Sequence, residues 1–446
     1  MMRISQIRLP WLSHYCSMTP DLFIENGSII NPVDKSIQQA HVRIRGGVIT
    51  DIGPDLGVMD EYVVDADKRF ISPGWMDMHV HFRDPGQEHK ETIETGCRAA
   101  AFGGFTAVAC MPNTDPPIDT REAIHSIIQR SLNLPVDVHP IACVSQGRLG
   151  KNLSQMAELV DAGAVGFSDD GSPVQGGSLM RRALEYSRIL GKPIINHMED
   201  VTLGPKGQMN EGLISTRLGL TPTPTFSEES MLARDLMLAE LTSGHLHVAH
   251  VSTARSTAMI REAKARGVSV TAEACTHHFS LTDEIVQESG FDSHTKMHPP
   301  LRTAQDVEAI RSGLHDTTLD AICTDHAPHA SFEKETDFVS APFGIIGLET
   351  AWGLIGRYLI APKHLTMMDA VYKICVSPRK ILGLDVPAIE VGQEANITIF
   401  DASSDWTFES GHIHSKSRNT PFIGSRMTGR AWAIYHKGHL VENKDR

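Results

Sequence analysis

A His-x-His pair is the first sign of chemistry in this chain. His79 and His81 end a largely hydrophobic run that begins at residue 70. Side chains two residues apart on a β-strand point to the same side, so both imidazoles can face one metal ion. Imidazole nitrogens suit zinc and related transition metals, and a catalytic zinc site keeps one position open for water. Alone, such a pair is weak evidence, because chance places histidines on surfaces and in cores as well.

Similar ligand types recur after four other apolar runs. These candidates are Asp170, His197, His250 and Asp325. Each has an ordinary explanation by itself: a hydrogen-bonded histidine, a turn aspartate or a helix-capping aspartate. Their joint placement is the stronger observation, because the carboxyl ends of strands converge at one face of a parallel barrel.

The elements that must position these residues are eight apolar runs typical of buried strands. They cover residues 75–78, 105–111, 136–142, 164–167, 193–196, 245–249, 268–271 and 319–323. Helical patterns lie between them, for example at 92–102, 153–162, 179–190 and 228–241. Eight β-α units in series favour an α/β fold with a (β/α)8 TIM-type barrel over an open sheet.

Both ends of the chain alternate hydrophobic and polar residues around Asn-Gly and Gly-Gly turns, which is typical of β-hairpins. We therefore predict one small β-sandwich domain built from residues 21–72 and 385–446, flanking a hydrolase barrel at 73–384. Residues 1–20 are predicted to be an extension, either disordered or a transit peptide, unless translation starts at Met18.

Composition narrows the class of protein. The formal net charge of -13 argues against nucleic acid or an anionic membrane as a partner, since both need a basic surface. No apolar stretch approaches the ~20 residues that span a bilayer. Seven scattered cysteines without a C-x-x-C pair make a disulfide framework unexpected, so we expect a reducing, cytoplasmic compartment. We expect an enzyme with a small-molecule substrate.

Eight segments together resemble the amidohydrolase superfamily and, within it, the type I dihydroorotases. They are DMHVHFRDPG, MPNT, FSDDG, INHMED, AHVST, KMHPPLR, TDHAPH and APFGIIGLET, and they cover nearly the whole predicted barrel. The resemblance implies reversible hydrolysis of L-dihydroorotate to N-carbamoyl-L-aspartate, a step of de novo pyrimidine biosynthesis. It further implies one or two zinc ions per subunit, with a homodimer and aspartate carbamoyltransferase as candidate assemblies.

The resemblance also implies roles for individual residues. His79, His81 and Asp325 would bind the more buried metal ion, and His197 and His250 the second. Asp170 would bind or bridge the metals, where many relatives use a carboxylated lysine. Asp325 would also be the catalytic base and acid. The implied substrate-binding residues are His81, Arg83, Asn113, His298, His329, Phe343 and Gly344.

Two features separate the alternatives within this superfamily. FSDDG contains no lysine, whereas dihydropyrimidinases, allantoinases and ureases place one there. Arg83 and Asn113 favour a carboxylated substrate over a neutral hydantoin, dihydropyrimidine or allantoin ring. A non-catalytic homologue that scaffolds aspartate carbamoyltransferase should have lost ligands, and none is lost here.

One position departs from the implied pattern. His298 stands where the family has Asn in K-x-N-P-P-L-R, which leaves its effect on affinity, pH dependence and specificity open. His can still donate or accept a hydrogen bond at this position. The pair His277-His278, near the end of the seventh predicted strand, is interpreted as structural or as supporting the metal ligands, because the implied ligand set is already complete.

Overall fold

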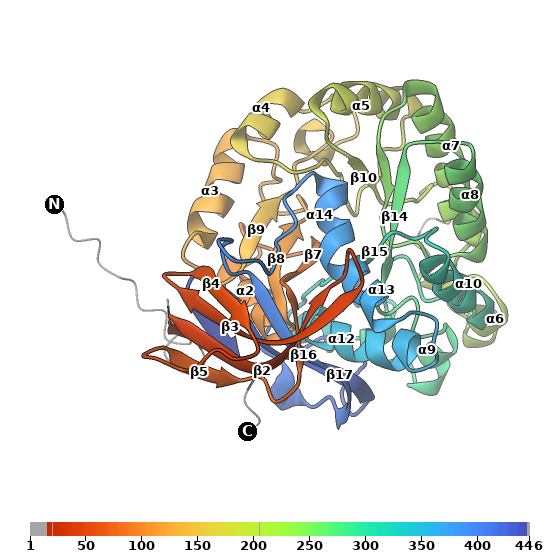
Figure 1. Ribbon diagram of the computed structural model, residues 1–446. Helices are drawn as coiled ribbons and strands as arrows, with labels where there is room; N and C mark the ends of the chain where they lie inside the picture. The colour runs from red at the N-terminus through yellow and green to blue at the C-terminus, as the bar shows by residue number, and fades with distance from the viewer. Residues whose placement is uncertain (1–15, 20, 205, 444–446) are drawn as a thin grey trace.

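The structure is a computed structural model that describes residues 16–19, 21–204 and 206–443 (Figure 1). Most of the predicted extension at 1–20 lies outside these residues, so its disorder and the start at Met18 stay predictions. One part of it differs from a disordered extension. Strand β1 (Cys16–Met18) pairs antiparallel with β18 (His439–Glu442), where backbone hydrogen bonds at the sheet edge hold it.

Parallel strands form the centre of the molecule. One group runs in the order β7 (Trp75–Val80), β8 (Phe105–Cys110) and β9 (Asp137–Pro140). The other runs in the order β10 (Ile194–Asn196), β13 (Leu246–Val248), β14 (Val270–Cys275) and β15 (Ala321–Cys323). All pairings within the two groups are parallel, as a (β/α)8 barrel requires.

Single parallel bridges join the two groups into a ring. Phe167 bridges both Ala142 and Ile194, and Val80 bridges His326. The predicted barrel is therefore confirmed, with one local difference. Residues 164–167 form no regular strand, because Gly163 ends the preceding helix with a φ of 114° and leaves only a few residues before the next loop.

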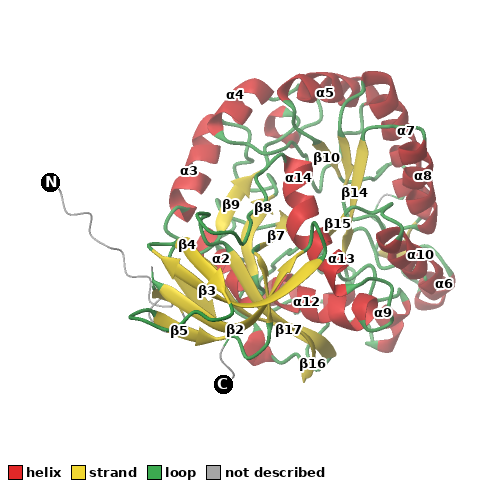
Figure 2. Ribbon diagram, viewed as in Figure 1, coloured by secondary structure: helices red, strands yellow, loops and turns green. Residues whose placement is uncertain are grey.

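Helices surround these strands (Figure 2). They are α2 (Ile93–Phe102), α3 (Arg121–Ser131), α4 (Met156–Ala162), α5 (Gly177–Leu190), α6 (Leu213–Leu218), α7 (Thr225–Thr242), α8 (Ala254–Ala265), α9 (Glu284–Glu288), α10 (Ala304–His315), α11 (Ser331–Lys334), α12 (Ala351–Ile355), α13 (Met367–Val371) and α14 (Ser377–Leu382). Shorter elements are η1 (Gln146–Arg148), η2 (Ser293–Thr295), η3 (Leu348–Thr350), η4 (Gly356–Ile360), η5 (Tyr372–Val376), η6 (Ser410–His412), β11 (Met209–Asn210) and β12 (Pro222–Thr223). Among the described residues, no helix combines the length and apolar character needed to cross a membrane.

Strands from both ends of the chain build one nine-stranded sheet beside the barrel (Figure 1). Its remaining strands are β2 (Leu22–Asn31), β3 (Ser36–Arg45), β4 (Val48–Gly53), β5 (Tyr62–Asp65), β6 (Phe70–Pro73), β16 (Ile397–Thr407) and β17 (Arg426–His436). The strands form a single sheet. Within it, the pairing of β2 with β3 shifts in register between Ile24 and Gly27. Ile24, Ile44, Ile397 and Tyr435 belong to one buried apolar cluster, so the two ends of the chain share a core.

The sheet anchors the first barrel strand. β6 pairs with β2 and β16 and leads through Gly74 directly into β7. A Cβ at Gly74 would lie 1.9 Å from Asn396 Oδ1, so only glycine fits this close crossing. The buried indole of Trp75 packs on Trp352, with ring centroids 4.6 Å apart. The β7 strand, which carries the His-x-His pair, is thereby fixed from its first residue.

Candidate active site

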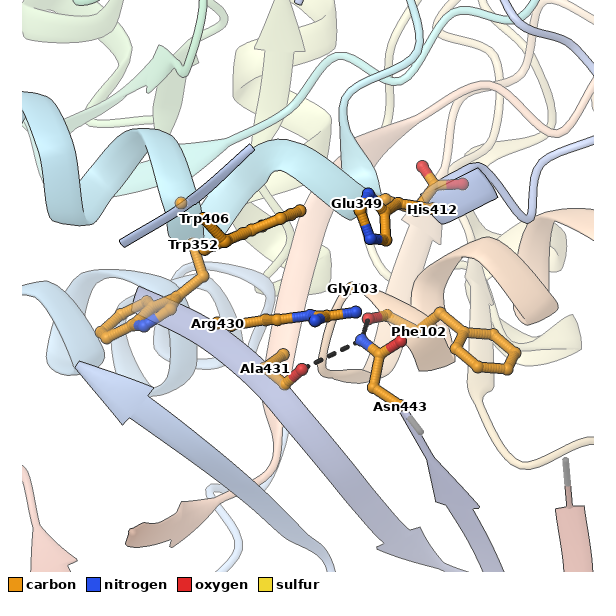
Figure 3. A pocket seen from close by; sticks show the side chains of 10 residues that line it. Phe102, Gly103, Glu349, Trp352, Trp406, His412, Arg430, Ala431 and Asn443 are labelled. Atoms are coloured by element: carbon orange, nitrogen blue, oxygen red, sulfur yellow. Dashed lines mark hydrogen bonds between the residues drawn. The ribbon is translucent and has the colours of Figure 1, made fainter. Parts of the chain in front are cut away.

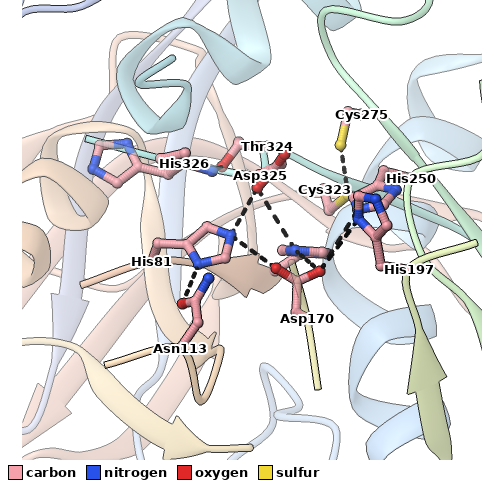
Figure 4. Close-up of polar contacts among 12 residues, drawn as sticks. His81, Asn113, Asp170, His197, His250, Cys275, Cys323, Thr324, Asp325 and His326 are labelled. Atoms are coloured by element: carbon pink, nitrogen blue, oxygen red, sulfur yellow. Dashed lines mark hydrogen bonds and ion pairs between the residues drawn. The ribbon is translucent and has the colours of Figure 1, made fainter. Parts of the chain in front are cut away.

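The six predicted metal ligands meet at the carboxyl ends of the barrel strands. Figure 4 shows the labelled side chains of His81, Asp170, His197, His250 and Asp325 gathered around one point. His79 joins them from β7, and all six residues are buried. Strand ends far apart in the sequence thus bring their side chains together in one polar cluster.

The first part of the cluster contains His79, His81 and Asp325. His81 Nε2 lies 2.9 Å from Asp325 Oδ1, and His79 Nε2 lies 3.6 Å from the same oxygen. Ligating atoms of these three residues all lie within 4.8 Å of one another. This is the set that the family resemblance implies for the more buried metal ion.

Asp170 lies between this set and the other two histidines. Its Oδ2 is 3.5 Å from His81 Nε2, and its Oδ1 is 3.6 Å from His79 Nε2. The same Oδ1 is 3.8 Å from His197 Nδ1 and 3.7 Å from His250 Nε2. One carboxylate therefore faces both halves of the cluster, which is the arrangement expected of a bridging ligand.

These distances fit a metal site better than a hydrogen-bond network. Two ligand atoms bound tetrahedrally at about 2.1 Å to one zinc-sized ion stand about 3.4 Å apart. Among the described residues, His79 Nε2 and Asp170 Oδ1 are buried without a hydrogen-bond partner. Buried polar atoms normally have a hydrogen-bond partner. Two such atoms that face each other without one indicate that a cation binds between them.

The electrostatic field of the cluster also favours a positive charge. Burial by itself lowers the pKa of His79, but the carboxylates of Glu273 and Asp170 outweigh it and raise this pKa to about 10. Burial raises the pKa of Asp170, yet contacts with His250 and His79 hold it well below its usual range. The carboxylates thus stay ionised and attract cations.

Several of these residues have unusual backbones. Arg83, His250 and Asp325 adopt positive φ angles of 60°, 30° and 49°. Non-glycine residues in this region cost about 1–3 kcal/mol each, so they persist only where the surroundings enforce them. Here the bridge between Val80 and His326 ties strand ends on both sides of the cluster.

Glu273 is a site residue that sequence reasoning missed. Its Oε1 lies 2.6 Å from His79 Nδ1, and its Oε2 lies 3.4 Å from His247 Nε2. A carboxylate only accepts, so His79 Nδ1 carries the proton and Nε2 is the atom free for a metal. The available signal was a glutamate inside the otherwise apolar strand 270–275.

Several of the predicted substrate-binding residues contact one another or the metal cluster. His81 Nδ1 donates to Asn113 Oδ1 at 2.8 Å. Arg83 Nε donates to the Pro328 carbonyl at 3.2 Å, and an Arg83 terminal nitrogen lies 3.5 Å from His329 Nε2. Basic and amide groups therefore gather on the side of the cluster next to His81.

Asn419, which no sequence motif indicated, hydrogen-bonds to the backbone of both His329 and Gly344. His329 Nε2 donates to the Phe343 carbonyl at 2.7 Å. The Asn419 amide, from the C-terminal part of the chain, donates to the Gly344 carbonyl at 3.0 Å and accepts from His329 N. No motif marks Asn419, because its role arises only when the chain's end returns to the barrel.

His298 lies at the opposite side of the cluster. Its ring stacks on His197 with centroids 4.8 Å apart, and its Nε2 lies 2.9 Å from Glu199 Oε2. It also faces Phe343, at a centroid distance of 5.1 Å. Burial raises the pKa of Glu199, but contacts with His197 and His298 hold it well below the usual range. His298 is therefore fixed in position beside a candidate ligand.

A separate small cavity lies between α2 and β17 (Figure 3). Its lining includes Trp352, Trp406, Arg430 and Asn443, and no candidate site residue is among its lining residues. Asn443 donates there to the Ala431 carbonyl at 3.0 Å. This cavity belongs to the contact between barrel and sheet and is not part of the active site.

Comparisons with known proteins agree with this geometry. A family model described as Dihydro-orotase-like matches residues 68–256. The dihydroorotase of Pelotomaculum thermopropionicum is 48% identical over 420 residues, covering 94% of this chain and 98% of that protein. The dihydroorotase of a Geobacter species is 45% identical over 423 residues, covering 94% and 99%.

Solved structures resemble the chain in fold. An L-hydantoinase (dihydropyrimidinase) from Arthrobacter aurescens gives a TM-score of 0.84 at 24% identity, covering 96% of this chain and 97% of that one. A dihydropyrimidinase from Brevibacillus agri gives 0.82 at 22% identity, covering 95% and 96%. Relatives that are nearly half identical over nearly the full length, together with the converging ligand cluster, show that this chain belongs to the dihydroorotase family of cyclic amide hydrolases.

Proposed function

We propose that this member of the family is a zinc enzyme that interconverts L-dihydroorotate and N-carbamoyl-L-aspartate. The observation that carries the substrate assignment is the buried Arg83 guanidinium next to the ligand cluster. Among the described residues, no carboxylate lies within ion-pairing distance of it. A buried guanidinium needs an anionic partner, and the substrate carboxylate supplies one in bidentate geometry.

Zinc is the metal that this ligand set favours. Four imidazoles and two aspartates match its preference for nitrogen and carboxylate ligands. His79, His81 and Asp325 would hold one ion, His197 and His250 a second, with Asp170 between them. Zinc at such a site lowers the pKa of bound water toward ~7 and polarises a carbonyl oxygen.

Asp325 is the proposed proton carrier. Its carboxylate would accept the proton of the attacking water and deliver it to the ring nitrogen as the amide bond breaks. Burial raises its pKa, but contacts with His81 and His79 hold it well below the usual range, so it starts ionised. Arg83, Asn113 and His329 would hold the substrate carboxylate, and backbone groups near Phe343 and Gly344 would hold the ring.

The second candidate is a hydrolase of neutral rings, since the structural neighbours named above include hydantoinases. The absence of a lysine from FSDDG, at residues 167–171, and the presence of Arg83 disfavour it. A homodimer and an aspartate carbamoyltransferase partner stay predictions. The six cysteines whose side chains are described are all free, which supports the proposal of a reducing cytoplasm.

The substrate assignment is tested by ring opening with the zinc-loaded protein. L-dihydroorotate should be turned over, and dihydrouracil, hydantoin and allantoin should react far more slowly, because they lack the carboxylate. In the Arg83→Ala variant, the kcat/KM values for dihydroorotate and dihydrouracil should differ less than in the wild type. Preferred turnover of a neutral ring would overturn the assignment while leaving the metal site intact.

Asp325→Ala should lower kcat by orders of magnitude, because the variant loses both a ligand and the proton carrier. Circular dichroism should show the fold retained. The matched control is Asp320→Ala. Asp320 precedes β15, the strand that Asp325 follows, and its carboxylate pairs with Lys264. Near-normal turnover by Asp325→Ala would refute the assigned role.

His298→Asn should change kcat/KM for dihydroorotate by roughly 2- to 10-fold, the effect of one hydrogen bond. The substitution restores the amide that the family resemblance implies, and it breaks the contact with Glu199. His294→Asn, in η2, is the control for general effects of losing a histidine. If kcat/KM stays unchanged in the His298 variant, this residue does not contact the substrate.

Glu273→Gln should weaken binding of divalent metal by about 10- to 100-fold, because the carboxylate that orients His79 loses its charge. Competition with a chelator measures this affinity directly. Glu229→Gln provides the control, since Glu229 is a buried carboxylate that faces Arg255 outside the cluster. Equal metal affinities in wild type and Glu273→Gln would remove Glu273 from the site.

A further inference from the structure

A second group of ligand-type side chains lies beside the catalytic cluster and takes no part in the proposed reaction. Cys275 and Cys323 are register partners on the neighbouring strands β14 and β15. Their sulfur atoms lie 3.4 Å apart, and both residues are buried (Figure 4). Two thiols are thus aligned side by side at the carboxyl ends of their strands.

Two imidazoles lie next to Cys275. Ligating atoms of Cys275, His277 and His278 all lie within 4.8 Å of one another. His277 is 1% exposed, and within the described part of the chain neither of its ring nitrogens has a hydrogen-bond partner. Leaving one buried polar atom unsatisfied costs about 1–3 kcal/mol, so an imidazole with two such atoms indicates a missing partner.

His278 has the tautomer that leaves one ring nitrogen free to bind a metal ion. Its Nε2 lies 3.0 Å from the Pro299 carbonyl, so that nitrogen carries the proton. Nδ1 then has a free lone pair, and it is buried without a partner in the described structure. This is the hydrogen bond that commonly fixes the tautomer of a metal-binding histidine.

We propose that Cys275, Cys323 and His277, with His278 as fourth ligand, bind a thiophilic divalent metal ion at a site distinct from the catalytic cluster. Two cysteines and two histidines form a common tetrahedral donor set for zinc. Two sulfur atoms bound at about 2.3 Å to one tetrahedral ion stand about 3.8 Å apart, so a small side-chain rotation suffices here. The larger cadmium ion also prefers such sulfur ligands.

Binding exchanges protons for metal. Burial raises the pKa of both the Cys275 and the Cys323 thiol, so both are protonated before the ion arrives. Two S–H bonds break, two metal–sulfur bonds form, and two protons leave to solvent.

The proposed site lies next to the catalytic centre. Cys323 Sγ lies within 4.8 Å of ligating atoms of both His79 and Glu273. An ion held by the thiols would add positive charge next to the first catalytic metal position. A thiophilic metal in excess is therefore expected to inhibit the enzyme by binding at the thiol site, without competing with the substrate.

Cadmium binding to the reduced, full-length protein tests this proposal. We expect an ultraviolet sulfur-to-cadmium charge-transfer band and one equivalent of cadmium beyond that held by the catalytic ligands. The band and that equivalent should disappear in Cys275→Ala/Cys323→Ala. They should persist in His197→Ala, which disables the second catalytic metal position only.

A matched double variant, Cys97→Ala/Cys143→Ala, removes two other buried cysteines and should keep the band. If the test variant fails to fold, the single substitution Cys323→Ser should still weaken the band. Absence of the band in wild type, or an unchanged band in the Cys275/Cys323 variants, would overturn the proposal.

Discussion

The structure depends on burying two carboxylates, Asp170 and Asp325, among four histidines at one end of a parallel barrel. Charged groups leave water only where opposite charge or a metal compensates for lost hydration. Asp170 Oδ1 lies 3.6, 3.8 and 3.7 Å from nitrogens of His79, His197 and His250, too far for hydrogen bonds yet close enough to share an ion. This constraint explains why the surrounding residues are tied so firmly in place.

The support for this cluster comes from both ends of the chain. The terminal sheet fixes the start of β7 through Gly74 and Trp75, so the His-x-His pair projects from a rigid strand. Glu273 then orients His79 from β14. Asn419 returns from the C-terminal part to hold the loop with His329 and Gly344. Distant segments thus cooperate in one site, as catalytic geometry requires.

Much of this arrangement could be predicted, because barrels obey simple rules. Apolar runs locate strands, and residues directly after them must share one face. The same rules predict that His79, Asp170 and Asp325 share one cluster. They overstate only the regularity of residues 164–167, where a helix ends too close to the loop for a strand to form.

What the sequence could not reveal are contacts set by strand order, loop conformation and strand register. Glu273 lies within a strand, and its pairing with His79 depends on the barrel placing β14 and β7 on either side of β15. The contact of His298 with Glu199 depends on a loop conformation. The paired thiols of Cys275 and Cys323 depend on strand register, which apolar patterns leave undetermined when both faces are buried.

Anomalous diffraction from crystals of the zinc-loaded protein tests the central claim most directly. The account predicts zinc peaks within the cluster, one bound by His79, His81 and Asp325 and a second by His197 and His250, with Asp170 between them. A single peak at the first position would still agree with a one-metal enzyme. Zinc bound elsewhere, with these six side chains contacting no ion, would contradict it.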